Sequence, residues 1–200
     1  TLELNPTADM LLDCFGDVDG TGAFYALGGT MNYVFSVVTN TAGAMLAAPG
    51  PTSQSIFAAG AGDVTIRVTD AHGCEADATI TFTQPTELTP GTIGINQVIC
   101  FEDIADTIRE LTAAGGGPVG GYSHQWQMSS VVAGPYSNIP GETGLYYVPS
   151  PVLGASSYYR REVRAGICAA AYTDTIEVVV NPMPSGLLTG GATIDRKSVV

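Results

Sequence analysis

The chain has 200 residues, only 13% of them charged, and a formal net charge of -12 at pH 7. This balance excludes a nucleic-acid binder, because phosphate backbones are bound by basic surfaces. It also disfavours binding to anionic membrane surfaces. Polar residues interrupt each apolar run well short of the roughly 18 residues that span a bilayer, so no membrane insertion is expected. The length fits one or two domains of about 100 residues.

Three strand-like runs, each closed by a proline, divide the chain: LELNP, TFTQP and VVVNP, ending at Pro6, Pro85 and Pro182. Proline cannot continue a central strand, so these positions are predicted unit boundaries. The tail 195–200, DRKSVV, fits no pattern elsewhere and is expected to be non-native. The predicted units are 1–6 as the end of a preceding unit, 7–89 and 90–182 as two β-sandwiches, and 183–194 as the start of a truncated third unit.

Alternating apolar and polar residues indicate strands beside the punctuation marks. In DVTIRVT from Asp63, every second residue is apolar, as in a half-buried strand. ATITFT, NYVFSVV, SYYRREV and DTIEVVV are also rich in residues that favour strands. The predicted fold class is therefore all-β, with two tandem Ig-like β-sandwich domains. The segment 102–111 could form either a short helix or, in its second half, a strand.

Each of the two predicted β-sandwiches carries one cysteine near its start and one near its end. An even number of cysteines in a chain of extracellular character favours disulfides. The predicted pairs lie within the units, Cys14 with Cys74 and Cys100 with Cys168. Four buried free thiols in a cytosolic protein are the alternative.

The stretch DCFGDVDG, residues 13–20, could hold a metal or form a turn. Asp17 and Asp19 are candidate calcium ligands, although the Phe and Ala at the matching positions do not fit an EF-hand loop. A turn at Asp19–Gly20 is favoured, because Asp-Gly suits a tight reversal. No cofactor is predicted.

The sequence offers little support for catalysis. His72 is predicted at the tip of a turn in which Asp70 binds its own backbone, and His124 at the edge of the core with its polar atoms satisfied. Neither stands beside a plausible nucleophile, so no catalytic residue is assigned and the protein is not expected to be an enzyme. GGGPVGG, 115–121, lacks the end of a phosphate-binding motif and is predicted to be a mobile loop.

Aromatic and basic side chains suggest two further surfaces. The tyrosines could form a platform that stacks on sugars, about half of them being core residues instead. The arginines are expected on a solvated strand beside acids rather than in an anion-binding patch. The residues concerned are Tyr146, Tyr147, Tyr158 and Tyr159, and Arg160, Arg161 and Arg164. Trp126 is predicted to fill the core of the second unit.

The motifs CFGDVDG, GGTMNY, VTDAHGC and TQP of the first unit resemble the SprB-type repeat of giant surface adhesins in gliding, type IX-secreting bacteria. GYSHQWQ, YSNIPGETGLYYVP, SYYRREV and VVVNP of the second resemble the Ig-like modules that accompany such repeats. The resemblance covers about residues 5–182. It implies an extracellular location at the cell surface.

The resemblance further implies a non-enzymatic structural and adhesive repeat segment of a large secreted protein, acting as a spacer and adhesion module. Its expected partners are neighbouring repeats of the same chain and a surface glycan or polysaccharide. A carbohydrate-binding appendage of a secreted multidomain enzyme is the alternative.

Overall fold

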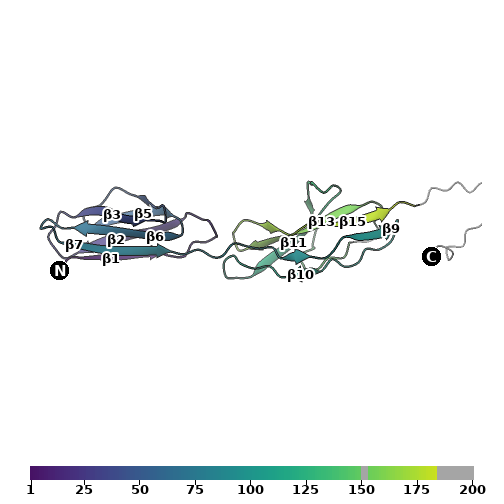
Figure 1. The fold of residues 1–200 in the computed structure, drawn as a ribbon, viewed down its shortest axis with the longest axis horizontal. Coiled ribbons are helices and arrows are strands. Elements are labelled where there is room, and N and C mark those ends of the chain that lie inside the picture. Colours follow the sequence, from purple (N-terminus) through teal and green to yellow (C-terminus); the bar gives the residue numbers. More distant parts are fainter. Residues whose placement is uncertain (150–152, 184–200) are drawn as a thin grey trace, which may run out of the picture.

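In the computed structural model, which describes residues 1–149 and 153–183, two β-sandwich modules lie end to end (Figure 1). We call the strands from Glu3 to Phe82 the first module, those from Thr92 to Asn181 the second module, and residues 83–91 the linker. The N-terminus lies at the end of the first module remote from the second. Each module therefore has an upstream end, where its chain begins, and a downstream end, where its chain leaves.

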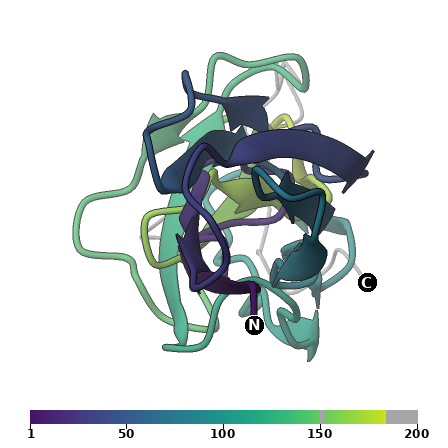
Figure 2. The ribbon, with the colours of Figure 1, turned by 90° about the vertical axis from the view of Figure 1, so that its left-hand side faces the viewer.

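The first module packs a four-stranded sheet, ordered β1-β2-β5-β4, against a three-stranded sheet, ordered β3-β6-β7. Viewed along the long axis, strands of this module curve around its interior (Figure 2). The strands are β1 Glu3–Asp9, β2 Gly20–Leu27, β3 Val34–Asn40, β4 Met45–Leu46, β5 Ser53–Ala59, β6 Gly62–Thr69 and β7 Glu75–Phe82.

Alternation along β6 supplies the centre of the first core. Its apolar residues Val64, Ile66 and Val68 are fully buried, as the sequence pattern predicts. Opposite them lie buried side chains of the other sheet, including Phe24 and Ile56. The expectation that residues 1–6 end a preceding unit is wrong, because β1 pairs with β2 along its whole length and contributes Leu4 to this core.

The second module has a larger sheet, ordered β12-β11-β13-β15-β9 with β14 beside β13, and a two-stranded sheet of β8 and β10. The last strand, β15, pairs in parallel with β9 and antiparallel with β13. The strands are β8 Thr92–Ile93, β9 Gln97–Cys100, β10 Glu110–Thr112, β11 Tyr122–Ser129, β12 Ser137–Asn138, β13 Ser157–Ala165, β14 Ala171–Tyr172 and β15 Ile176–Asn181.

Trp126 fills the centre of the second core, as predicted. It is fully buried, and its indole Nε1–H donates to the Gly144 carbonyl at 2.9 Å. The ring centroid of Tyr147 lies 5.6 Å from that of Trp126 and 5.5 Å from that of Tyr159, which ties three aromatic rings into one cluster. In the segment 102–111 the strand alternative is correct, since Glu110 begins β10.

The sequence did not reveal a buried arginine in this core. Arg161 has no exposed side-chain surface, because β13 turns every second residue inward. Its guanidinium donates to the Glu110 carboxylate at 2.6 Å and to the Leu145 carbonyl at 3.0 Å. A buried charge is tolerated only when it is paired in this way, so Arg161 anchors β13 to β10 across the module.

The other two arginines of β13 lie on its opposite face. The Arg160 guanidinium stacks between the rings of Tyr136 and Tyr172, 4.1 Å from each centroid. The Arg164 side chain pairs with Glu162 at 2.5 Å and is about half exposed. The expectation of a solvated strand beside acids therefore holds for Arg164 but is wrong for Arg161.

No helix able to cross a membrane occurs in residues 1–149 or 153–183. The predicted third unit, 183–194, and the predicted non-native tail, 195–200, lie outside the described residues apart from Met183.

We expect Arg161→Met to lower the free energy of unfolding of the second module by about 3–5 kcal/mol, because Glu110 loses its buried partner. Fluorescence of Trp126, the single tryptophan, reports this module in urea titrations. Arg164→Met, the same change at a half-exposed arginine on the same strand, should cost less than about 1 kcal/mol. Equal losses in the two variants would contradict the role of Arg161.

Candidate functional site

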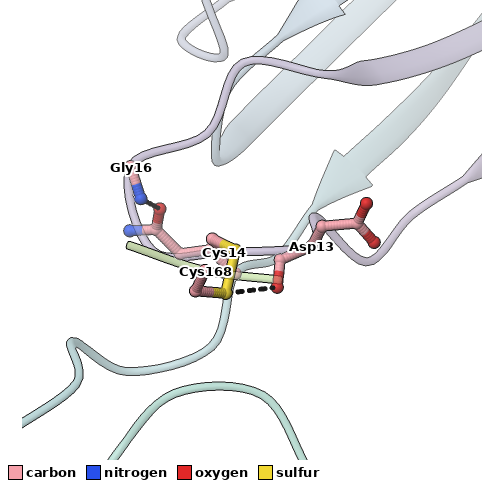
Figure 3. The surroundings of a disulfide bond; sticks show 5 residues. Asp13, Cys14, Gly16 and Cys168 are labelled. Carbon is pink, nitrogen blue, oxygen red and sulfur yellow. Dashed lines mark hydrogen bonds between the residues drawn. A yellow bond between two sulfur atoms is a disulfide. The ribbon is translucent and has the colours of Figure 1, made fainter. Parts of the chain in front are cut away.

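A disulfide joins the two modules at their junction. Cys14, which follows β1, is bonded to Cys168, which lies between β13 and β14, with 5.7 Å between their Cα atoms. The bond links positions 154 residues apart in sequence. Figure 3 shows the bond beside Asp13, whose carbonyl oxygen lies 3.6 Å from the Cys168 sulfur. The modules are thus covalently connected twice, by the linker and by this disulfide.

The predicted pairs Cys14–Cys74 and Cys100–Cys168 are therefore wrong. Cys74 and Cys100 are free and exposed. Within each module the two cysteines lie at opposite ends, because strands of about eight residues, roughly 25 Å long, separate them. A disulfide needs Cα atoms within about 7 Å of each other, so the two cysteines of one module are too far apart to form one.

The first cysteine of each module opens the same kind of turn, which we call the early-cysteine turn. The Asp17 N–H donates to the Cys14 carbonyl at 3.3 Å, and the Asp103 N–H donates to the Cys100 carbonyl at 3.1 Å. The third residue of each turn has a positive φ, 81° at Gly16 and 63° at Glu102. The sequence motif Cys-Phe-x-Asp occurs at residues 14–17 and again at residues 100–103, and it has the same backbone shape in both places.

Both early-cysteine turns lie at the downstream end of their modules. Leu11 pairs in parallel with Thr83, the residue after the last strand of the first module. In the second module Cys100 itself pairs in parallel with Asn181, the last residue of β15. The first cysteine of each module therefore lies at the end from which the chain leaves that module.

The tight turn of 13–20 is not where the Asp-Gly pair predicts it. It is centred on Phe15–Gly16, and Gly20 begins β2. The Gly16 N–H donates to the side-chain Oε1 of Gln84 at 2.8 Å, so the linker holds the turn in place.

The second cysteine of each module lies in a reversal at the upstream end, which we call the late-cysteine turn. Cys74 closes the turn between β6 and β7, and Cys168 follows β13. Each turn contains a glycine of positive φ, Gly73 at 81° and Gly166 at 56°. Cys168 thereby reaches back to the downstream end of the first module.

Asp70 holds the late-cysteine turn of the first module. One carboxylate oxygen accepts the N–H groups of His72 and Cys74, each at 2.9 Å, and the other accepts the Thr30 N–H at 3.0 Å. The bonds from Thr30 and Cys74 hold the pKa of Asp70 below its usual range. This confirms the predicted self-bonded turn with an exposed His72.

The glycine-rich segment 115–121 seats the linker rather than forming a free loop. Gly117 N–H donates to the Thr86 carbonyl at 2.8 Å, and Gly115 exchanges two backbone hydrogen bonds with Thr89. A Cβ on Gly116, which has a φ of 73°, would meet the Glu87 carbonyl oxygen at 1.9 Å. Glycine is thus required where the linker crosses this segment. The disulfide and the hydrogen bonds between the linker and this glycine-rich segment, which we call the glycine seat, together restrict movement of one module relative to the other.

A cavity of about 640 Å³ lies at the junction beside the disulfide. Its lining comes from both modules and the linker, and includes Phe15, Leu88, Pro118, Ile167 and Tyr172. Phe15 and Ile167 keep half or more of their surface exposed, so the modules meet without a large apolar interface. The covalent bond therefore carries much of the connection.

The calcium candidates do not form a cluster. Asp17 belongs to the early-cysteine turn and lines the junction cavity, and Asp19 is exposed. In residues 1–149 and 153–183, no three His, Cys, Asp or Glu side chains are placed to hold a metal ion.

Neither histidine belongs to a catalytic triad in the described part of the chain. The His72 Nδ1 lies 2.7 Å from the Thr30 hydroxyl, but Asp70 bonds the backbone of both residues rather than the imidazole. His124 is half-buried, and burial followed by the nearby Arg161 charge lowers its pKa. Its Nδ1 has no hydrogen-bond partner, so the expectation of a satisfied histidine is wrong.

The four tyrosines divide between core and surface, as predicted. Tyr147 and Tyr159 are buried, whereas Tyr146 is 62% exposed. The Tyr158 hydroxyl donates to Glu177 at 2.9 Å, and this bond is the main cause that raises its pKa. Of the proposed sugar platform, only Tyr146 offers a broadly exposed ring.

The fold and junction define a tandem of Ig-like β-sandwiches joined by an intermodule disulfide. A family model described as a domain of unknown function (DUF8696) matches residues 89–182. No curated protein matches the chain.

Similar solved structures are also tandem arrays. The two Ig domains of DIP-gamma are 10% identical, with 88% of this chain and 97% of that one covered and a TM-score of 0.45. The N-terminal eight Ig domains of Down Syndrome Cell Adhesion Molecule are 14% identical, with 90% of this chain and 25% of that one covered and a TM-score of 0.41. The D00-D0 domain of intimin is 14% identical, with 90% of this chain and 100% of that one covered and a TM-score of 0.39. None of these likenesses assigns an activity or partner to this chain.

We expect non-reducing peptide mapping to recover Cys14 bonded to Cys168. Cys168→Ser should free Cys14 for alkylation and lower the stability of the enclosed segment, by about 5 kcal/mol in the chain-entropy model. Cys100→Ser, which removes a free thiol, is the matched control and should change neither result. A Cys14–Cys74 peptide would contradict the structure.

We expect Asp70→Asn to lower the melting temperature at neutral pH. Folding lowers the pKa of Asp70, so its carboxylate stabilises the folded state fully above the ordinary aspartate pKa of about 4. This stabilisation is lost as the pH falls through the pKa of the folded state. The difference from wild type should therefore shrink on acidification. Asp9→Asn, at an exposed carboxylate, is the control, and a difference independent of pH would contradict this account.

Proposed function

We propose that the chain is a non-enzymatic structural and adhesive repeat segment of a large secreted cell-surface protein, in which it acts as a spacer. The observation that carries this proposal is the disulfide between Cys14 and Cys168, because it joins two modules rather than the strands of one. It stabilises the folded tandem by closing a long loop, and it does not cross-link two strands of the same core. Its physical effect is on how the modules are held relative to each other.

The position of the bond supports a role under tension. A force applied to the two ends of the chain passes from residue 14 across the sulfur atoms to residue 168. Residues 15–167, which include most of both cores, are then excluded from the covalent path that bears the load. Unfolding of this segment cannot lengthen the molecule while the bond is intact.

The arrangement of the ends also suits a spacer. The first module begins and the second module ends at opposite ends of the tandem, so further modules would extend it along its long axis (Figure 1). The linker is fixed to the glycine-rich segment, which limits bending at the junction. A disulfide of this kind persists in oxidising, extracellular surroundings, which supports the proposed location.

We expect single-molecule stretching of the oxidised chain by its termini to release only the residues outside 15–167. Reduction should add about 500 Å of extension, at roughly 3.4 Å per extended residue. Cys100→Ser should behave like wild type, and Cys168→Ser should release the full length without reductant. Full extension of the oxidised wild-type chain would refute the proposed mechanical role.

A further inference from the structure

The two free cysteines lie at the opposite, outward ends of the tandem. Cys100 is in the early-cysteine turn at the downstream end of the second module, and Cys74 is in the late-cysteine turn at the upstream end of the first. Each therefore occupies the same place in its module as one partner of the bonded pair, Cys14 or Cys168. The bonded junction is a template for both.

We propose that Cys100 and Cys74 are each one half of a further intermodule disulfide, whose other half comes from a β-sandwich module of the same kind. Cys100 would bond the late-turn cysteine of a following module, and Cys74 the early-turn cysteine of a preceding one. This inference rests on the proposed function, because it requires further modules on both sides.

The backbone at Cys100 supports this assignment. Its turn has the same hydrogen bond as the turn at Cys14, and Glu102 takes a left-handed conformation that costs a non-glycine residue free energy. Cys100 also pairs with Asn181, the last residue of β15, after which a following module would begin. The turn at Cys100 thus has the shape of the turn at Cys14, although no following module covers it in the part of the chain that the structure describes.

The surface along β9, the strand that ends at Cys100, is suited to contact another module. A cavity of about 700 Å³ lies next to β9, and its lining includes Ile95, Val98 and Ile104. These three side chains are between 68% and 77% exposed. At the observed junction a cavity of similar size lies beside the bonded Cys14. An incoming module would cover apolar surface that is now exposed to water.

At the other end, Asp70 fixes the turn that carries Cys74. Its carboxylate accepts the Cys74 N–H directly, so the backbone of the cysteine is held although its thiol is exposed. A thiol fixed in position forms a disulfide with less loss of chain entropy than a thiol on a free loop.

The bond forms by thiol–disulfide exchange with a small-molecule disulfide. The two cysteine thiols lose two electrons and two protons and form one S–S bond. The small disulfide accepts the two electrons and the two protons and leaves as two thiols. Exposure of Cys74 and Cys100 gives such an oxidant access to both sulfurs.

The proposed bonds have a fixed direction. An early-turn cysteine at a downstream end meets a late-turn cysteine at an upstream end, so modules join head to tail in an open array. In such an array this tandem would have two parallel covalent paths, one across the Cys14–Cys168 bond and one from Cys74 through residues 75–99 to Cys100. Most of every core would then be outside the load path.

A concatemer of the chain tests the proposal. Asn181 of a first copy is followed by a repeat of residues 83–91 and then by Glu3 of a second copy, which reproduces the linker of the observed junction. Cys74 of the first copy and Cys100 of the second are changed to serine, so that one free thiol remains in each copy. In a glutathione redox buffer, we expect Cys100 of the first copy to bond Cys74 of the second, as read by peptide mapping.

The matched control moves the thiol along the same strand by the double change Cys100→Ser and Val98→Cys in the first copy. Val98 is 68% exposed and points to the same side of β9 as Cys100, so its tether and access are equivalent. We expect the equilibrium constant for the native pair to exceed that of the control by about tenfold or more, because only Cys100 is held in the junction geometry. Trp126 fluorescence checks that both proteins are folded.

Equal bonding in the control, or no bond at Cys100, would overturn the inference. The stretching experiment on the single chain depends on Cys14 and Cys168 alone. Failure of the concatemer test therefore leaves the proposed spacer function standing, whereas failure of the stretching experiment would remove that function directly.

Discussion

The disulfide between Cys14 and Cys168 is the constraint on which the properties of this tandem depend. Each module has its own core, and at the junction Phe15 and Ile167 keep 50% and 84% of their surface exposed. The linker, held by the glycine-rich segment, also connects the modules. With the bond, two sandwiches with separate cores are also linked covalently through Cys14 and Cys168.

The bond can form because each sandwich places its two cysteines at opposite ends. Parallel pairing of the early segment with the last strand brings Cys14 to the end where the chain leaves the first module. A strand reversal brings Cys168 to the end where the second module begins. The order of the two modules thus puts the early-turn cysteine of the first beside the late-turn cysteine of the second.

Inside the second module, stability comes from a cluster that combines aromatic and charged groups. Trp126, Tyr147 and Tyr159 pack together, and the Arg161 guanidinium lies over the indole ring, with its central carbon 6.0 Å from the ring centroid. The Arg161 pair with Glu110 joins the large sheet to the small one. This ion pair connects the two sheets, and removal of either partner would leave the other charge without its counter-charge and destabilise the module.

The sequence by itself determined the strands, because alternation such as that around Ile66 follows directly from the two-residue period of a strand. It also determined the turn at Asp70, the core position of Trp126 and the equivalence of the two Cys-Phe-x-Asp motifs. Only the tertiary structure decided which cysteines meet, because pairing depends on the end of the sandwich at which each lies. Burial of Arg161 and the glycine seat at Gly116 were likewise decided by contacts between segments far apart in the chain. Local pattern specifies strands and turns, whereas the distance between two sulfur atoms is set by the whole fold.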